Sequence, residues 1–108
     1  MSQAVLSDAF KTEVLQATEP VLVDFWATWC APCRALAPLI ERLSEQYEGR
    51  AKVVKLDVDK APDVATEYGV QSIPTVILFQ GGKERARWVG GQPLTTYTRA
   101  LDAQLAAQ

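Results

Sequence analysis

The sequence of 108 residues contains no histidine and only two cysteines. Without histidine the chain can hold neither a histidine general base, nor the usual serine or cysteine triad, nor a histidine metal ligand. It also has no surplus of basic residues, because eleven Lys and Arg stand against thirteen Asp and Glu, for a formal net charge of -2. Since phosphate groups are recognised by clustered positive charge, we expect no nucleic-acid partner.

Long apolar runs are also missing. The longest ones, such as 21–29 and 76–79, are far shorter than the roughly 20 residues that a membrane span requires. The first residues, Met1–Leu6, lack the basic start and the apolar stretch of a secretory signal. We therefore expect a cytoplasmic protein that does not enter the membrane. Thiols are kept reduced in that compartment, which favours a catalytic, redox-sensing or metal-binding cysteine pair over a permanent crosslink.

What is present is enough apolar material for a core. Hydrophobic residues make up 48% of the chain, and a chain of this size hides about 65% of its unfolded surface on folding. A disulfide between the cysteines is therefore not needed to stabilise the fold. We expect residues 1–108 to form one domain that works as a monomer.

Apolar side chains that recur at helical spacing predict four helices. Ser7 and Asp8 are expected to cap the first helix, and proline is well placed to open the other three. The expected helices run from Ser7 to before Pro20, from Pro32 to before Gly49, from Pro62 to Tyr68, and from Pro93 onward.

Four strands are expected between these helices, at Val21–Trp26, Val53–Asp59, Thr75–Gln80 and Glu84–Val89. The first is apolar on both faces except at Asp24, as is typical of a strand in the middle of a sheet. Two glycines between the last two strands fit a hairpin turn. The pattern predicts an α/β fold, with a central mixed β-sheet flanked by helices on both faces.

Both cysteines lie in Cys30-Ala31-Pro32-Cys33, where the first strand gives way to a helix. A structural disulfide closing so short a loop would contribute only roughly 2 kcal/mol. A zinc site needs four ligands, which this chain could supply only as a dimer sharing four thiolates. A redox dithiol is the third reading, and it is favoured because a helix N-terminus stabilises a thiolate. We then expect Cys30 to attack a substrate disulfide and Cys33, one turn further into the helix, to resolve the mixed disulfide.

The stretch Asp24–Arg34, DFWATWCAPCR, closely resembles the active-site segment of the thioredoxin family. The likeness continues in the same order and spacing through Ala37-Pro38, Lys55–Asp59, Tyr68–Val70, Ile73–Thr75 and Val89-Gly90. It implies a thioredoxin fold over nearly the whole chain and a general protein-disulfide reductase with no bound cofactor. Disulfide-containing proteins would be its substrates, and a flavin- and NADPH-dependent thioredoxin reductase would be its electron donor.

The resemblance also gives roles to two charged residues. By itself Asp24 is an odd carboxylate in an apolar strand, and it could instead lie at an exposed edge. The family likeness implies that Asp24 is buried and that it accepts and returns the proton of Cys33. It implies further that Lys55, on the neighbouring strand, is the partner of Asp24. Taken alone, Lys55 could be an ordinary solvated residue.

A docking surface beside the cysteines is the last implication. An ordinary X-Pro bond is trans, but the resemblance implies a cis Ile73-Pro74 bond that faces the dithiol, with the Ile73 backbone pairing to a substrate segment. Apolar residues around it would complete the surface: Trp29, Ala31, Pro32, Ile73, Val89 and Gly90. We expect Trp26 in the core and Trp88 at the surface or at a sheet edge.

The sequence departs from the common family pattern at two positions. Ala31 replaces the usual glycine between the cysteines, and Ser72 stands where a glycine is frequent. Because Ala31 and Pro32 separate the thiols, they help to set the redox potential. Two rival functions are a thiol oxidase or isomerase, which Ala31-Pro32 and the missing export signal disfavour, and a binding module that uses the apolar surface while its redox chemistry is incidental.

Overall fold

The structure is a computed structural model that describes residues 2–108. Its elements follow in the order β1 (Gln3–Ala4), α1 (Ser7–Phe10), the π-helical η1 (Lys11–Leu15), β2 (Val21–Trp26), α2 (Ala31–Gln46), β3 (Lys52–Asp57), α3 (Pro62–Glu67), β4 (Thr75–Gln80), β5 (Lys83–Val89) and α4 (Leu94–Ala106). In this part of the chain no helix is both long and apolar enough to cross a membrane.

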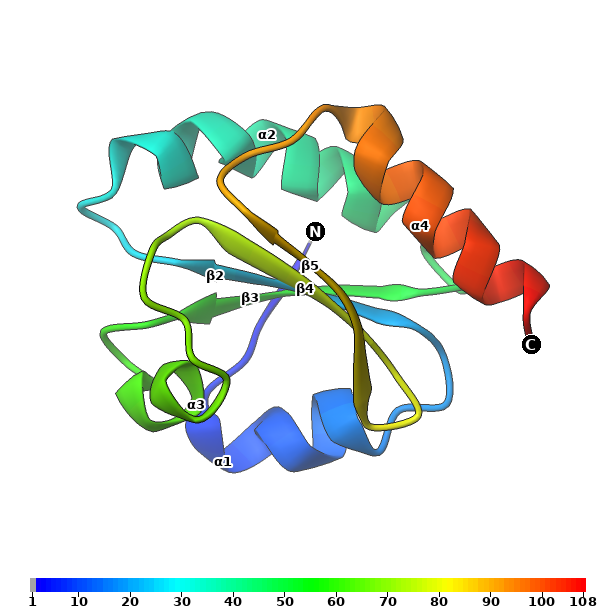
Figure 1. The fold of residues 1–108 in the computed structure, drawn as a ribbon, viewed down its shortest axis with the longest axis horizontal. Coiled ribbons are helices and arrows are strands. Elements are labelled where there is room, and N and C mark those ends of the chain that lie inside the picture. The colour runs from blue at the N-terminus through cyan, green and yellow to red at the C-terminus, as the bar shows by residue number, and fades with distance from the viewer. Residues whose placement is uncertain (1) are drawn as a thin grey trace.

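The strands form one mixed sheet in the order β1-β3-β2-β4-β5 (Figure 1). β2 lies at its centre, parallel to β3 and antiparallel to β4. The predicted bounds of β2 and β4 are confirmed. Side chains on both faces of these strands are buried, and this burial fixes which residues pair with the neighbouring strands. β5 forms one edge, and the β4–β5 pairing contains an irregularity between Leu78 and Phe79.

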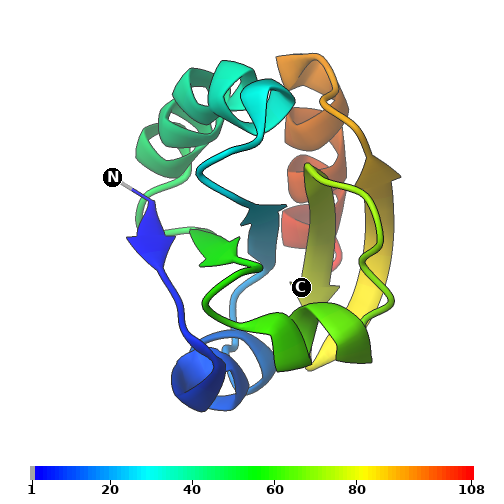
Figure 2. The ribbon, with the colours of Figure 1, turned by 90° about the vertical axis from the view of Figure 1, so that its left-hand side faces the viewer.

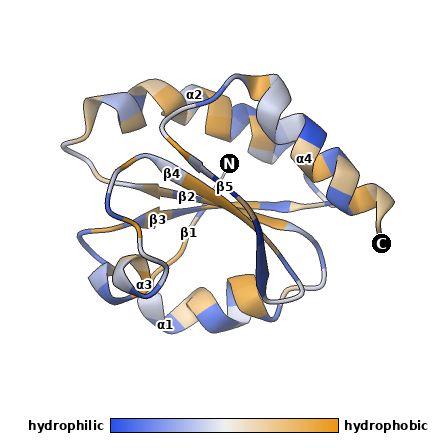
Figure 3. Ribbon diagram, viewed as in Figure 1, coloured by the Kyte–Doolittle hydropathy of each residue, from blue (hydrophilic) through white to orange (hydrophobic). Residues whose placement is uncertain are grey.

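Helices cover both faces of the sheet, as predicted (Figure 2). On one face α1, η1 and α3 pack against Val21, Val23 and Phe25 of β2. On the other face α2 and α4 pack against the side of β2 that carries Leu22. The interior strands are correspondingly rich in hydrophobic residues, whereas the helices alternate along their length (Figure 3). Side chains of β2 on the second face therefore point toward α2, the helix that begins beside the cysteines.

The N-terminal part of the chain differs from the sequence prediction. β1 was not expected, because two residues carry no usable periodicity. Ser7 and Asp8 do not cap the first helix: Leu6 occupies the N-cap position, and the Ser7 hydroxyl donates to Asp63 Oδ1 at 2.5 Å. The helix then widens into η1, whose last turn closes with a bond from Gln16 N–H to the Lys11 carbonyl at 2.9 Å.

The hairpin between β4 and β5 turns as the two glycines predict. Gly81 and Gly82 have φ values of 61° and 78°, which glycine adopts without strain. A side chain at Gly82 would also meet the Leu15 carbonyl oxygen at 3.0 Å. The turn therefore packs closely against η1.

Trp88 lies on the edge strand β5, as predicted, and is half-buried there. It lies on β5 with its ring centroid 5.3 Å from that of Tyr97 on α4, at an angle of 87°. This edge-to-face contact joins β5 to the core beneath α2 and α4. The tryptophan is a packing residue.

Candidate active site

The two cysteines lie at the start of α2, where the chain leaves the central strand. Cys30 is the N-cap residue, and its sulfur accepts a hydrogen bond from the Cys33 N–H at 3.2 Å. Pro32 occupies the first turn, where a missing N–H costs nothing. The two side chains form a disulfide, and their Cα atoms are 5.2 Å apart. The local sequence thus places Cys30 Sγ where the unpaired N–H groups of a helix point.

Burial does not distinguish the two cysteines, since Cys30 is 4% and Cys33 2% exposed. They form a small apolar cluster with Ala27, against which Trp26 and Ile73 pack. Their positions on the helix do distinguish them, because the sulfur of Cys30, but not that of Cys33, accepts a bond from the helix backbone.

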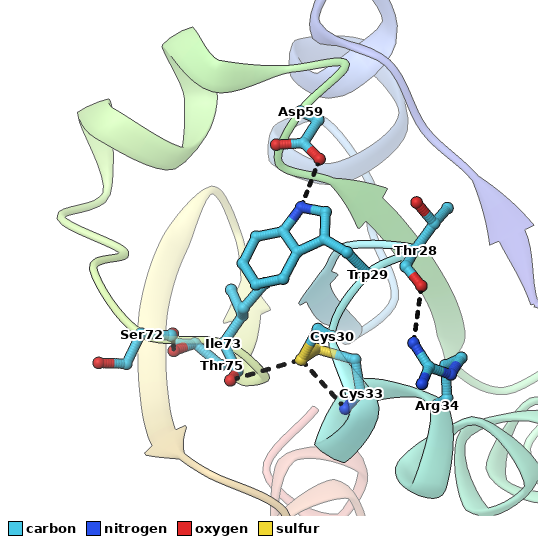
Figure 4. The surroundings of a disulfide bond; sticks show 9 residues. All are labelled: Thr28, Trp29, Cys30, Cys33, Arg34, Asp59, Ser72, Ile73 and Thr75. Carbon is cyan, nitrogen blue, oxygen red and sulfur yellow. Dashed lines mark hydrogen bonds between the residues drawn. A yellow bond between two sulfur atoms is a disulfide. The ribbon is translucent and has the colours of Figure 1, made fainter.

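The segment before β4 faces the disulfide. The Ile73-Pro74 bond is cis, as the family resemblance implied. The Ile73 carbonyl oxygen lies 3.7 Å from Cys30 Sγ (Figure 4). Neighbouring bonds fix the segment: the Thr75 hydroxyl donates to the Ser72 carbonyl at 2.5 Å, and the Gly90 N–H donates to the Pro74 carbonyl at 2.8 Å. The segment that leads into β4 therefore places the Ile73 backbone next to the sulfur of Cys30.

Asp24 is a buried carboxylate on the central strand, so the alternative of an exposed edge position is wrong. Its Oδ1 atom is buried and finds no hydrogen-bond partner among residues 2–108. Burial raises the pKa of Asp24 to about 7, and the positive charge of Lys55 acts in the opposite direction. A carboxyl group with such a pKa can both take up and release a proton near neutral pH.

Lys55 lies beside Asp24 in the sheet, since the two residues are register partners on β2 and β3. Its ammonium group sits 4.2 Å from the centroid of the Trp26 ring. The ion pairs found within residues 2–108 do not include one between Lys55 and Asp24. Lys55 therefore acts on Asp24 through its field, while its charge rests on an aromatic face.

The expected docking residues gather around the disulfide but differ in exposure. Trp29 and Val89 are 66% and 61% exposed, and they are among the most exposed large apolar side chains of the described chain. Ile73 and Gly90 are half-buried, and Pro74 is buried. The side chains of Ala31 and Pro32 are exposed at the start of α2.

Two side-chain contacts at the site were not foreseen. The Trp29 indole N–H donates to Asp59 Oδ2 at 2.7 Å, and Arg34 Nη1 donates to the Thr28 carbonyl at 2.9 Å (Figure 4). The first joins residues 30 positions apart, and no local pattern signals such a contact. Both bonds hold the loop between β2 and α2, which carries the exposed indole.

The chemistry available here is that of two thiols and one carboxyl group. Within residues 2–108 no group of three or more Cys, Asp or Glu side chains is placed to hold a metal ion. When reduced to two thiols, this pair can pass two electrons to another disulfide by exchange and returns to the Cys30–Cys33 disulfide seen here.

Comparison with known proteins gives the same family as the sequence resemblance. The family model for Thioredoxin matches residues 2–103. The chain is 48% identical over 101 residues to Thioredoxin 1 of Nostoc sp., with 94% of each chain covered. It is 50% identical over 101 residues to the thioredoxin of Synechocystis sp., with 93% of this chain and 94% of that one covered. It is 45% identical over 102 residues to the chloroplastic M-type thioredoxin of Chlamydomonas reinhardtii, with 94% of this chain and 73% of that protein covered. The chain therefore belongs to the thioredoxin family, and its Cys30–Cys33 pair makes it a protein-disulfide reductase that works by dithiol-disulfide exchange.

Proposed function

We propose that Cys30 is the attacking thiolate and Cys33 the resolving one. The Cys30 sulfur attacks a substrate disulfide, so that a Cys30–substrate bond forms, the substrate bond breaks, and the released sulfur takes a proton. Cys33 then loses its proton and attacks Cys30 Sγ, which forms the Cys30–Cys33 bond and releases the second substrate thiol. Two electrons pass from the pair to the substrate.

The observation that carries this assignment is the hydrogen bond from Cys33 N–H to Cys30 Sγ. In the reduced protein the same N–H, together with the positive end of the α2 dipole, favours a negative charge on Cys30. Cys33 lies within the first turn and receives no such bond. The arrangement supports the lower thiol pKa at Cys30, which is what the first step needs.

We propose that Asp24 handles the proton of Cys33, by way of a water molecule. The resolving step needs a base close to the first turn of α2, and Asp24 is a buried carboxyl group on the sheet face that α2 covers. With a pKa of about 7, Asp24 can both accept the proton of Cys33 and return it. In this scheme Lys55 keeps the pKa from rising further, as the partner of Asp24.

We propose that substrates dock on the exposed apolar side chains beside the disulfide. Trp29 and Val89 supply most of the surface, while the Ile73 backbone, turned by Pro74, pairs with an extended substrate segment. Gly90 leaves room beside Val89. Ala31 and Pro32 lie between the sulfurs and tune the redox potential of the pair.

We further propose the setting in which the protein works. Residues 1–108 act as one monomeric thioredoxin domain in the cytoplasm, where a thioredoxin reductase returns electrons to the Cys30–Cys33 disulfide. Proteins with accessible disulfides are the substrates, and nucleic acids and membranes are not partners.

The test of the proposed function is the reduction of insulin by dithiothreitol. With the protein present, the insulin chains should precipitate much sooner than with dithiothreitol alone. A time course unchanged by the protein would reject reductase activity. A variant Cys30→Ser that keeps full activity would reject the assigned nucleophile.

A further inference from the structure

A cavity of about 240 Å³ opens beside Lys55, on the side of the molecule where the N-terminal segment runs alongside β3. Trp26 and Lys55 line it from the sheet, Glu41 lines it from α2, and Ser2 lines it from the N-terminal segment. None of the exchange chemistry described above uses Glu41 or Ser2. Both nevertheless lie at the cavity that contains the partner of Asp24.

Lys55 is placed between two carboxylates. Asp24 is its register partner across β2 and β3, and Glu41 lines the same cavity from the helix above. The positive charge of Lys55 acts on both carboxyl groups. It is bonded to neither, since its ammonium group lies over the Trp26 ring. One cation thus has two competing anionic neighbours.

Ser2 holds one of these competitors. Its backbone N–H donates to Glu41 Oε2 at 2.8 Å, and its hydroxyl donates to Glu41 Oε1. Partial burial acts to raise the pKa of Glu41, but the two Ser2 bonds, the charge of the N-terminal amino group and, last, the Lys55 charge outweigh it and leave that pKa below its usual value. The segment is itself anchored at Lys55, because the Val5 N–H donates to the Lys55 carbonyl at 2.9 Å. Both oxygens of Glu41 are therefore occupied by the N-terminal segment.

We propose that Glu41 competes with Asp24 for the Lys55 ammonium group, and that Ser2 limits this competition by holding the Glu41 carboxylate. A Glu41 released from Ser2 would pair with Lys55 and weaken the field of that cation at Asp24. The N-terminal segment would thereby set the pH at which Asp24 exchanges its proton. The inference deepens the proposed function, because its consequence for turnover depends on the role of Asp24 there.

The other charged and titratable groups near this pair are few, and one of them is the N-terminal amino group, whose positive charge acts on Glu41. Asp57 and Lys60 line the same cavity from the end of β3 and the turn that follows it. Tyr97 faces Asp24 from α4, and its pKa is raised by burial and, to a lesser extent, by the Asp24 charge. Cys30 and Cys33 do not titrate while they form the disulfide. In the oxidised protein, changes in the titration of Asp24 can therefore be followed without interference from the thiols.

The experiment is a pH titration of the Asp24 carboxyl carbon by ¹³C NMR in the oxidised protein. Glu41→Gln should move the midpoint of Asp24 to lower pH, by about half a pH unit for a single charge across a partly hydrated cavity. Glu45→Gln is the matched control, since Glu45 lies one helical turn further along α2, is exposed and does not line the cavity. It should leave the midpoint unchanged. An equal shift in the two variants, or none in Glu41→Gln, overturns the proposal.

Two further variants test the route of the effect. In a Lys55→Met background, Glu41→Gln should shift the midpoint much less, because Glu41 then has no cation to compete for. An undiminished shift would show that Glu41 acts on Asp24 only by its own charge, and it would overturn the competition for Lys55. Ser2→Pro removes both donors to Glu41 and should raise the midpoint, whereas an unchanged or lowered midpoint would overturn the part assigned to Ser2. None of these readings needs enzymatic activity, so they remain decisive even if Asp24 has no role at Cys33.

Discussion

Asp24 and Lys55 face each other in register across β2 and β3, yet the ammonium group of Lys55 lies over the Trp26 ring and forms no ion pair with the carboxylate. Asp24 consequently stays buried with an unpartnered oxygen and with its pKa raised to about 7 by burial. A carboxylate in this state destabilises the fold when it is charged, and the cost has a definite pH dependence.

The first prediction concerns stability. Between the usual pKa of 3.8 and the raised value of about 7, the folded protein holds the Asp24 proton while the unfolded chain has lost it. The contribution of Asp24 to stability is therefore intact below pH 3.8 and is lost progressively as the pH rises through about 7, by at most about 4 kcal/mol. Asp24→Asn should raise the free energy of unfolding at pH 8 and bring little gain at pH 4. Denaturant unfolding of the oxidised protein at the two pH values measures this difference, and an equal effect at both would contradict the burial of the charge.

The second prediction separates the two cysteines. Cys30→Ser should abolish insulin reduction, because the attacking sulfur is gone. Cys33→Ser should accumulate a covalent Cys30–substrate complex, because nothing displaces the substrate. Non-reducing electrophoresis followed by mass spectrometry detects the complex. If the complex accumulated in Cys30→Ser, the two roles would have to be exchanged.

The third prediction concerns the step that Asp24 serves. Asp24→Asn should slow the release of reduced substrate by at least about tenfold near pH 7, because Asn cannot accept the Cys33 proton. The first attack, which uses Cys30, should change much less. Stopped-flow kinetics with a disulfide peptide can resolve the two phases. In the unaltered protein the release phase should show an inflection near pH 7 that the variant lacks, and equal slowing of both phases would argue against a role at Cys33.

The fourth prediction tests the docking surface. Val89→Asp places a charge on a side chain that is 61% exposed beside the Ile73 segment, and it should raise KM for a protein substrate by about tenfold. Val89→Thr, which nearly keeps the shape without the charge, serves as the control and should have a smaller effect. The reduction potential should stay the same in Val89→Thr, which adds no charge near the sulfurs. An unchanged KM in Val89→Asp would remove this residue from the surface.

The fifth prediction concerns the hairpin at the opposite end of β4. Gly81→Ala should cost about 1–2 kcal/mol, the ordinary penalty for a side chain at positive φ. Gly82→Ala should cost clearly more, because its Cβ would also meet the Leu15 carbonyl oxygen at 3.0 Å. Denaturant unfolding of the two variants compares the costs directly. Equal losses would mean that the turn and η1 do not constrain each other.

The sequence predicted the elements that are defined by their own residues. β2 and β4 were found with their full bounds because side chains on both of their faces are buried, and α2 was found from its apolar spacing and its proline. The misses depend on residues distant in the chain. Ser7 looks like a helix cap, but it bonds to Asp63, 56 positions away.

At the site, too, some features follow from neighbouring residues in the sequence and others depend on residues distant in the chain. The positions of Cys30 and Cys33 on the helix follow from local sequence, whereas the partners of their neighbours do not. No local sequence pattern predicts that Lys55 lies over Trp26, or that the Trp29 indole donates a hydrogen bond to Asp59. Such contacts depend on which strands become neighbours, and the topology of the sheet decides that.

The outer strand β5 also bears on how the protein avoids aggregation. An exposed sheet edge invites another chain to add a strand, and proteins discourage this with charged residues and irregular pairing. β5 has both, with exposed Lys83, Glu84 and Arg85 along its first half and a break in register opposite Leu78 and Phe79. The extended substrate segments that we propose to pair beside Ile73 thus meet an edge that is a poor template for fibril-like stacking.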